Sequence, residues 1–508
     1  MMSRFLLKIF SSSFLLILVT LIIKIPVFLS KHLQEDSFIT WRVARNLLQY
    51  GVIGFNGDER ISASTTHLYM GISAIFQMIF GGIFIYPVLV FSSILFAIGS
   101  IWMAKILFSH DVLKRGFFVI LFNMTPPALT ASCLGMEYGI LFFLDAGLIY
   151  YGLFKDRRWA FVLFPILLVW TRIDAVIFLG VIFLADLVIR RKINFIFMLG
   201  GILGLVSVLA FNFFYFGEFV NHTITAKKLA YKNLTPNHEP RYLFYQWAYY
   251  GGLIKKHAWW TLAIFLAFLG FLAYAFSRIL SGNAKISFRI KVILVAVVVF
   301  ALLKMAIFSV MKAYFDWYYW LPRLFLFIPV LYYFLNIFRL QKRLWIPSVF
   351  LAFFGLYIFQ LWQSFTIGYM EEKQRVQIAK DLKAENSGMN RSIILEPAGI
   401  IPFYTGLYTY DEVGLVNKRI NDEMVKDEKF WWMNSVRDFK PDYILTISKK
   451  PGGLYYHMKP EDLKYFDANY RLVKAYPISE VHRNAPEILS WIYKIRPIGK
   501  DYFLYKKL

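Results

Sequence analysis

Residues 84–104 read FIYPVLVFSSILFAIGSIWMA, a stretch without a charged side chain. As a helix it would be about 31 Å long, enough to cross the hydrocarbon core of a bilayer, which is about 30 Å thick. Similar apolar runs recur from the N-terminus to about residue 363, separated by short basic clusters. The chain is 58% hydrophobic and 19% aromatic, which is more apolar than a soluble core can bury. These patterns predict a polytopic α-helical membrane protein.

We predict eleven spans in a membrane domain of residues 1–363. They cover residues 9–30, 84–104, 116–132, 136–154, 159–171, 173–189, 193–215, 259–280, 291–311, 321–338 and 344–363. From residue 364 to residue 508 charged residues become frequent, and turn pairs such as Pro451-Gly452 appear. Strand-like Ser392–Leu395 and Tyr443–Ile447, with helix-like Asp422–Asp438 between them, predict a soluble C-terminal α/β domain.

Basic clusters set the predicted orientation, because cytoplasmic loops collect Lys and Arg. With the N-terminus inside, every predicted inner loop is basic. The clusters are Lys105, Lys114 and Arg115; Lys155, Arg157 and Arg158; Arg190, Arg191 and Lys192; Lys285, Arg289 and Lys291; and Arg339, Lys342 and Arg343. Counting the apolar segment His67–Phe80 as a span would invert every later loop, so we expect interfacial or re-entrant helices within residues 31–82.

In this orientation most acidic residues of the membrane half lie on the outer face. They are Glu35, Asp36, Asp58, Glu59, Glu137, Asp174, Glu218, Glu239 and Asp316. Carboxylates at membrane depth are costly and usually have a partner or a function, so we expect the binding or reactive site on this face. The alternative is that they are solvated loop acids that avoid the cytoplasmic side.

The outer loop 217–258 is unexpectedly basic. It contains Lys227, Lys228, Lys232, Arg241, Lys255 and Lys256. This excess favours anion binding, although a loop of about 40 residues is less constrained by the charge rule. The net charge of +24 does not indicate a nucleic-acid partner, because the basic residues are spread around the spans. The single cysteine, Cys133, excludes an intrachain disulfide framework.

The first outer loop carries the most informative motif. Residues 35–47 read EDSFITWRVARNL, residues 51–60 read GVIGFNGDER and residues 62–69 read SASTTHLY. Apolar and basic positions interleave after an acidic pair, which predicts an amphipathic helix at the membrane interface with the acids at its N-terminus. These positions are Phe38, Trp41, Arg42, Val43, Arg45 and Leu47. A helix cap combined with a surface anchor would explain the same pattern.

This loop resembles the first periplasmic loop of the GT-C superfamily of membrane glycosyltransferases, in the subgroup of bacterial terminal arabinofuranosyltransferases and mannosyltransferase-like proteins. That subgroup has an acidic pair, a Phe-Ile and Arg-Ala-Arg-Asn helix, an Asn-Gly-Glu-Arg turn and a Thr-Ser-Pro-Leu segment. Further similar motifs are GME at 135–137, TRID at 171–174, YFGE at 215–218, AK at 226–227, WYY at 317–319, PR at 322–323, EPAGI at 396–400, GLVN at 414–417 and KPDYI at 440–444. Three residues depart from the subgroup's pattern: Glu35 replaces the first aspartate of the acidic pair, and His67 and Ile173 stand where prolines are common. These departures are compatible with the same reaction class but leave the identity of the sugar and the acceptor open.

The resemblance implies a GT-C fold in the bacterial inner (cytoplasmic) membrane, with the active site and the C-terminal domain on the periplasmic side. It implies transfer of a sugar, with inversion, from a polyprenyl-phosphate donor to a glycan or glycolipid acceptor of the cell envelope. The base for such a reaction would be Asp36. Glu35 would orient it, hold a neighbouring arginine or bind a divalent cation. Two adjacent carboxylates fall short of an oxygen cage, so metal dependence is left open and no other cofactor is predicted.

The departing phosphate requires cationic donors, for which the motifs supply Lys227, Arg172, Arg323 and His67. The structural alternatives are that Arg172 pairs with Asp174 at a span end and that Lys227 or Arg323 reaches lipid headgroups. Glu137 and Asp174 are expected to line the cavity. Trp317 and Tyr318 would stack on a sugar or belong to an interfacial aromatic belt.

Two other functional classes are considered. A transporter or flippase of lipid-linked sugars would also need a charged membrane cavity, but we find no internal repeat and the charges lie at the outer edge. A non-catalytic scaffold in envelope assembly would not need the acids of the first loop. The C-terminal domain contains no glycine-rich phosphate loop or nucleophile elbow, so we expect it to bind the acceptor or another carbohydrate.

Overall fold

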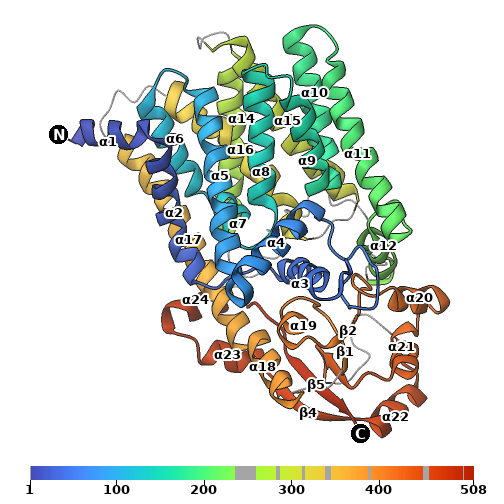
Figure 1. Ribbon diagram of the computed structural model, residues 1–508. Helices are drawn as coiled ribbons and strands as arrows, with labels where there is room; N and C mark the ends of the chain where they lie inside the picture. Colours follow the sequence, from blue (N-terminus) through green and yellow to red (C-terminus); the bar gives the residue numbers. More distant parts are fainter. Residues whose placement is uncertain are drawn as a thin grey trace. The chain divides into compact units, whose positions relative to one another are not determined.

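The computed structural model describes residues 2–234, 259–281, 286–311, 315–337, 345–386, 391–449, 457–495 and 497–508. These residues are mostly helical, and the chain divides into two compact units (Figure 1). The helical unit consists of Met1–Leu29, Ile85–Val208 and Pro240–Gln363, and the mixed unit of Ser30–Phe84, Leu209–Glu239 and Ser364–Leu508. Several residues used above lie outside the described part: Glu239, Arg241, Lys255, Lys256, Lys285, Arg339, Lys342, Arg343 and the turn at 451–453.

Each predicted span coincides at least in part with helix. The helices are α1 (Met2–Ser11), α2 (Ser13–Leu29), α5 (Ile85–Leu107), α6 (Val112–Asn123), α7 (Pro126–Cys133), α8 (Tyr138–Gly147), α9 (Ala160–Thr171), α10 (Val176–Arg190), α11 (Phe195–Phe216), α14 (Trp259–Leu280), α15 (Phe288–Val310), α16 (Trp320–Tyr332) and α17 (Trp345–Lys373). Short 3-10 segments precede α10 (η3, Ile173–Ala175) and α16 (η5, Asp316–Tyr319). Aromatic pairs join several of them, such as Phe96 on α5 and Phe142 on α8, whose ring centroids are 4.6 Å apart.

Five helices in the described part of the chain are long and apolar enough to cross a membrane: Ile85–Leu107, Phe195–Phe216, Phe288–Val310, Asp316–Asn336 and Ser348–Glu385. A sixth span would combine α6 and α7, which are bent by 71°. The bend follows from Pro126 and Pro127, which cannot continue the preceding helix. The helices are those of a multi-pass membrane protein, with five or six clear spans among the described residues where the sequence predicts eleven.

The other predicted spans fall on shorter or interrupted helices. Ser13–Leu29 has 17 residues and Ala160–Thr171 has 12, which correspond to about 26 Å and 18 Å of helix. α8 changes to a π-helix at Leu148. Apolar composition continues through these breaks, so a count of apolar runs cannot detect them.

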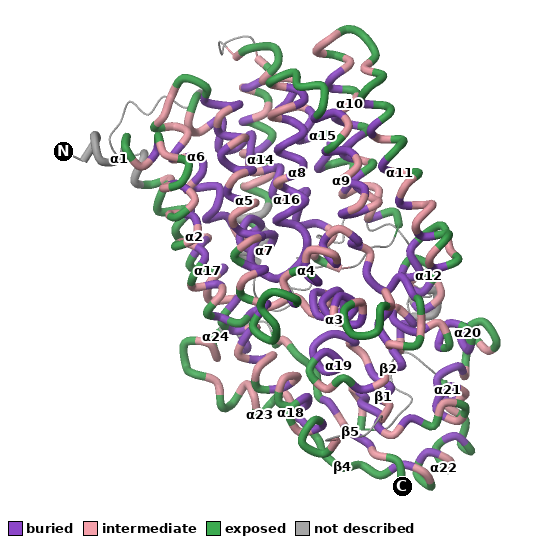
Figure 2. The backbone as a smooth tube through the Cα atoms, in the orientation of Figure 1, coloured by how far each residue is buried: buried purple, intermediate pink, exposed green. Residues whose placement is uncertain are grey.

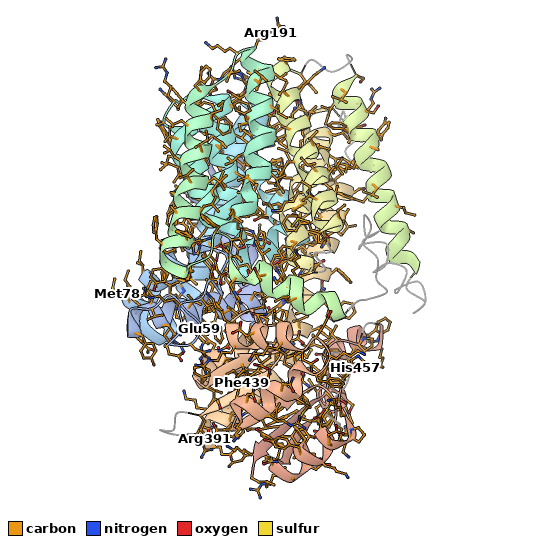
Figure 3. All side chains as sticks on the ribbon, turned by 90° about the vertical axis from the view of Figure 1, so that its right-hand side faces the viewer. Glu59, Met78, Arg191, Arg391, Phe439 and His457 are labelled. Carbon is orange, nitrogen blue, oxygen red and sulfur yellow. The ribbon has the colours of Figure 1, made fainter. Side chains whose placement is uncertain are left out.

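The segment predicted to be interfacial or re-entrant forms α4 (His67–Phe80), with the expected bounds. A helix of 14 residues is about 21 Å long, too short for the hydrocarbon core. One face packs Met70 and Ala74 into the mixed unit, whereas Ile75 and Met78 are exposed, as Figure 3 shows for Met78. An exposed apolar face is what an interfacial helix requires, and its place in a membrane stays a prediction.

The C-terminal part of the mixed unit is an α/β structure, as the sequence predicts. Its strands are β1 (Ser392–Leu395), β2 (Tyr408–Asp411), β3 (Tyr443–Thr446), β4 (Tyr470–Tyr476) and β5 (Tyr502–Lys507), in the sheet order β2-β1-β3-β5-β4. The first three strands are parallel, and β5 runs antiparallel to β3 and β4. Its helices are α18 (Arg375–Glu385), α19 (Ile400–Thr405), α20 (Lys418–Lys426), α21 (Trp431–Phe439), α22 (Pro460–Asn469), α23 (Ile478–Arg483) and α24 (Glu487–Ile495).

The single helix predicted over 422–438 is wrong: α20 and α21 are separate. Asp427 ends α20 in an extended conformation, and its side chain accepts the backbone N–H groups of Lys429 and Phe430 over 3.1 Å. This local turn competes with continuation of the helix.

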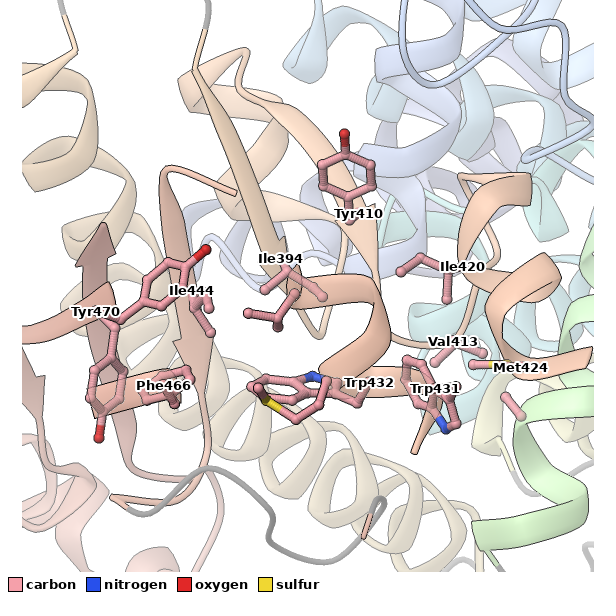
Figure 4. Close-up of a cluster of buried hydrophobic side chains, with 14 residues drawn as sticks. Ile394, Tyr410, Val413, Ile420, Met424, Trp431, Trp432, Ile444, Phe466 and Tyr470 are labelled. Carbon is pink, nitrogen blue, oxygen red and sulfur yellow. The ribbon is translucent and has the colours of Figure 1, made fainter. Parts of the chain in front are cut away.

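Alternating strand residues build cores on the two faces of the sheet. Ile394 and Ile444 face a cluster that includes Trp431 and Trp432 (Figure 4). Ile393 and Leu395 face the opposite cluster, with Ile378 and Leu382 of α18. A third core joins the first loop to the C-terminal region, because Val43 and Ile61 pack with Ala398 and Val416. The first loop is therefore an integral part of the mixed unit.

Candidate functional site

The predicted catalytic acids stand at the start of α3 (Glu35–Tyr50), in the mixed unit. α3 is buried along most of its length (Figure 2), and Trp41, Val43 and Ala44 are fully enclosed. The prediction of a helix lying on a membrane surface is wrong for most of α3, because protein covers both of its faces. Its last turn exposes Leu48 and Tyr50.

Glu35 is the first residue of α3, and three donors converge on its carboxylate. The backbone N–H groups of Gly399 and Ile400 donate to Oε1 over 2.9 and 2.8 Å, and the Arg375 guanidinium lies 3.2 Å from Oε2. Arg375 also pairs with Glu371 at 2.8 Å. Burial raises the pKa of the Glu35 carboxyl to about 7, and Arg375 and the two N–H groups oppose this rise. The geometry matches the arginine-holding role considered for Glu35.

Asp36 follows in the first turn of α3, where the helix dipole favours a negative charge. Its side chain is partly exposed, whereas Ser37 and Phe38 are buried. Consecutive helical residues point about 100° apart, so Asp36 faces a different direction from the Glu35 carboxylate. The candidate base therefore stands on a helix that its neighbours hold in place.

Arg42 ties α3 to the C-terminal region. It is 6% exposed, and its guanidinium lies over the Phe55 ring, 4.3 Å from the centroid. It donates over 2.8–2.9 Å to three backbone carbonyl oxygens, those of Phe55, Pro402 and Leu407. Asn56 pairs with the backbone of Thr409 in both directions, over 3.1 and 3.0 Å. Arg42 and Asn56, two residues of the first-loop motif, thus make structural contacts with the C-terminal region.

His67, a predicted phosphate contact, begins α4 in an aromatic environment. Its Nε2 lies 2.9 Å from Asn212 Oδ1, and the rings of Phe211 and Phe216 are 5.2 and 6.0 Å from the imidazole. Burial lowers the pKa of His67 to about 4, so the imidazole is neutral at pH 7. A neutral ring can offer a hydrogen bond to a phosphate but no charge, which favours a structural role.

Lys227 lies on α12 (His222–Leu234) and is partly buried. The C-terminal region holds this helix, because His222 Nε2 is 2.7 Å from Asn421 Oδ1 on α20. Glu218, just before α12, pairs with Lys418 at 2.7 Å. The contact between Lys227 and a donor phosphate stays a prediction.

A second group of candidates meets in a buried charge cluster of the helical unit. Arg172, at the end of α9, donates to Glu137 over 2.6 Å and to Asp174 over 2.7 Å. Lys304 of α15 lies 2.9 Å from the other oxygen of Asp174. Two carboxylates already neutralise Arg172, so the geometry favours the pairing alternative over a phosphate contact. Glu137 and Asp174 hold this cluster together.

The remaining candidates lie in η5 and α16. Arg323 pairs with Asp316 through both terminal nitrogens, over 2.7 and 3.2 Å. The Arg172 guanidinium is 5.7 Å from the Tyr318 ring, so Tyr318 belongs to the charge cluster. Trp317 stacks on Phe315 with 4.4 Å between centroids. Sugar stacking by Trp317 and Tyr318 stays a prediction.

Asp145, Lys24 and Lys304 are charged residues inside apolar helices that do not appear among the sequence predictions. Asp145 on α8 and Lys24 on α2 are buried, and within the described residues neither side chain has a hydrogen-bond partner. Lys24 Nζ lies 4.5 Å from the centroid of the Phe96 ring. Lys304 is the third. All three fall inside predicted spans, so a charge within an apolar run is the signal that identifies them.

No group of three or more His, Cys, Asp or Glu side chains in the described part of the chain is arranged to hold a metal ion. The Glu35 carboxylate is already engaged by three donors, and Cys133 is buried. The divalent cation considered for Glu35 and Asp36 therefore gains no support from the geometry.

Residues 365–504 match the model of a domain of unknown function, DUF8728. No curated protein matches the chain. The matched segment lies in the mixed unit and contains Arg375, Pro402 and Thr409, which contact the first loop. The segment similar to DUF8728 thus contributes several of the contacts that hold the first loop.

Proposed function

We propose that this protein is an inverting membrane glycosyltransferase that moves a sugar from a polyprenyl-phosphate donor to a glycan or glycolipid acceptor of the cell envelope. The observation that carries the proposal is the acidic pair at the head of α3. It stands in the loop whose sequence resembles the GT-C first loop, and Glu35 is fixed there by three donors. The proposal includes a GT-C architecture of eleven spans, with the reaction on the periplasmic face of the bacterial inner membrane.

Asp36 is the proposed base. It takes the proton of the acceptor hydroxyl as the new glycosidic bond forms, while the polyprenyl phosphate leaves from the opposite face of the sugar. Such general-base assistance contributes about 10²–10⁴-fold. A base is effective only when it is held in position, and Glu35 and Arg42 fix the helix that carries it. Lys227 is the proposed contact for the departing phosphate.

The test is sugar transfer by purified protein from a radiolabelled polyprenyl-phosphate pentose or hexose to an envelope glycan. Asp36→Asn keeps size and polarity but removes the basic carboxylate, so kcat should fall by about 10²-fold or more with unchanged thermal stability. Asp58→Asn, a change of an exposed acid in the same loop, is the matched control and should retain activity. Full turnover by folded Asp36→Asn, or a product with retained anomeric configuration, would overturn the mechanism.

A second candidate, a transporter or flippase of lipid-linked sugars, is favoured by the charges buried inside apolar helices. Asp145, Lys304 and Lys24 are of the kind that lines membrane pathways in transporters. The discriminating experiment supplies proteoliposomes with a lipid-linked sugar and no acceptor. Movement of the sugar lipid across the bilayer that depends on Lys304 but not on Asp36 would favour transport over glycosyl transfer.

A further inference from the structure

α24 exposes two large apolar side chains on one face. Ile488 is 73% exposed and Trp491 is 61% exposed, and residues three apart share a helix face. Tyr493, by contrast, is 5% exposed and packs into the mixed unit. A helix on the surface of a soluble domain normally turns its apolar stripe inward. The exposure of Ile488 and Trp491 therefore indicates that this face of α24 contacts another apolar surface.

The hairpin of α23 and α24 is fixed to the end of α17. Tyr493 Oη donates to the carbonyl oxygen of Thr366 over 2.9 Å, and Tyr369 Oη donates to that of Asn484 over 2.8 Å. His482 of α23 stacks on Tyr493 with 4.1 Å between ring centroids. The hairpin of α23 and α24 therefore lies beside Thr366 and Tyr369, near the C-terminal end of α17.

The uncharged part of α17 indicates where this end of the helix lies relative to a bilayer. From Trp345 to Met370 it contains no charged residue, and Glu371 is the first acid that follows. This uncharged stretch is about 39 Å long as a helix, against about 30 Å for the hydrocarbon core and about 40–45 Å including the headgroups. A stretch of this length ends in the headgroup region, and its last turn contains Tyr369 and lies next to Thr366. The bilayer surface therefore lies beside α24.

We propose that α24 lies on the bilayer surface and inserts Ile488 and Trp491 at the boundary between headgroups and acyl chains. Tryptophan is enriched at this depth because its ring is apolar and its N–H is polar. The formal charges of the hairpin cancel, with two acidic and two basic residues: Glu480, Arg483, Glu487 and Lys494. Attachment thus rests on apolar insertion and does not require anionic lipid. This lipid contact is independent of the proposed glycosyl transfer.

The experiment uses the full-length chain with Cys133→Ser, carrying a single new cysteine at Ile488→Cys or Trp491→Cys. A polarity-sensitive fluorophore is attached, and the protein is placed in phosphatidylcholine nanodiscs with or without lipids brominated near the headgroup. The matched control is Val473→Cys on β4, which is 45% exposed. Its neighbour Lys474 pairs with Asp381 at 2.7 Å. Asp381 lies on the continuation of α17, about 16 Å beyond Met370 at the rise of a helix.

Labels at 488 and 491 should lose fluorescence to the brominated lipids and resist aqueous iodide, whereas the label at 473 should show the reverse. The same pattern should appear with zwitterionic and with anionic lipids. Equal iodide quenching at 488 and 473 would overturn the proposal. Shielding of 488 from both quenchers would also overturn it, because it would mean that protein covers α24. Insertion that requires anionic lipid would overturn the apolar mechanism.

Discussion

Replacing Arg42 with methionine should destabilise the protein more than any other arginine change in the first loop. Methionine keeps the apolar stem but removes the guanidinium that donates to the carbonyls of Phe55, Pro402 and Leu407. A hydrogen bond from a charged group contributes about 1.5–3 kcal/mol, and an orphaned buried acceptor costs about 1–3 kcal/mol. Partial repacking and entry of water recover some of the sum, so we expect a loss of about 3–5 kcal/mol.

Two neighbouring arginines provide a graded comparison. Arg45 donates once, to the carbonyl of Phe403 over 2.9 Å, and lies 4.0 Å from that ring's centroid. Its replacement by methionine should cost about 1–2 kcal/mol. Arg60 is exposed and lies 5.1 Å from the Tyr215 ring, so Arg60→Met should change stability by about 0.5 kcal/mol or less.

The assay is the apparent melting temperature of the purified protein in detergent, followed by tryptophan fluorescence, together with the rate of proteolysis of the C-terminal region. The order of destabilisation should be Arg42→Met, then Arg45→Met, then Arg60→Met. Arg42→Lys keeps the charge, but one ammonium cannot reproduce the planar fork that reaches three carbonyls, so its melting temperature should be intermediate. Equal melting temperatures for Arg42→Met and Arg60→Met would refute the assigned role of Arg42.

Two further predictions concern buried ionisable groups. Burial raises the pKa of Glu412 to about 8, although Trp432 Nε1 donates to it over 2.8 Å. The folded protein then binds this proton more tightly than the unfolded chain, whose value is near 4.5, so stability falls as pH rises from about 5 to 8. Glu412→Gln should flatten this slope in the melting temperature, whereas exposed Glu461→Gln should not; an unchanged slope in both would contradict the assignment. In the helical unit, Lys304→Met should lower the free energy of unfolding by about 3–5 kcal/mol, because it removes one of the cations that pair with the buried Asp174 carboxylate. Adding Asp174→Asn, which removes the negative charge, should recover part of that loss. Simple additivity of the two changes in melting temperature would show that the pair is not coupled.

Local patterns predict much of the fold. Apolar runs locate the membrane helices, and the length of His67–Phe80 identifies α4 as too short to span. β1 and β3 are recognisable because they are short, apolar and almost wholly buried. β4 is missed because five consecutive residues of it, 471–475, are exposed and give no alternating pattern. The break between α6 and α7 is missed because apolarity continues through Pro126 and Pro127.

The site is harder to predict because its contacts are not local. The spacing of Arg42 and Arg45 indicates a polar helix face. Burial of that face depends on carbonyl groups about 360 residues further along the chain, which no local pattern contains. The acidic pair could be identified because a helix N-terminus is a local feature. Lys304 could have been identified as well, since a lysine inside an apolar run is visible in the sequence.

The contacts of the first loop narrow its functional candidates. A side-chain atom that is hydrogen-bonded to the protein's own backbone cannot bind substrate at the same time. By this reasoning Arg42, Asn56 and Glu35 are positioning residues, since each reaches into the segment 399–409 or to Arg375. Asp36, the base in the proposed mechanism, follows Glu35 in the first turn of α3, so the same contacts position it. Under the proposed glycosyl transfer, the segment similar to DUF8728 would influence turnover through the geometry of α3. Weakening its contacts with α3 should then lower kcat before it changes the affinity for either substrate.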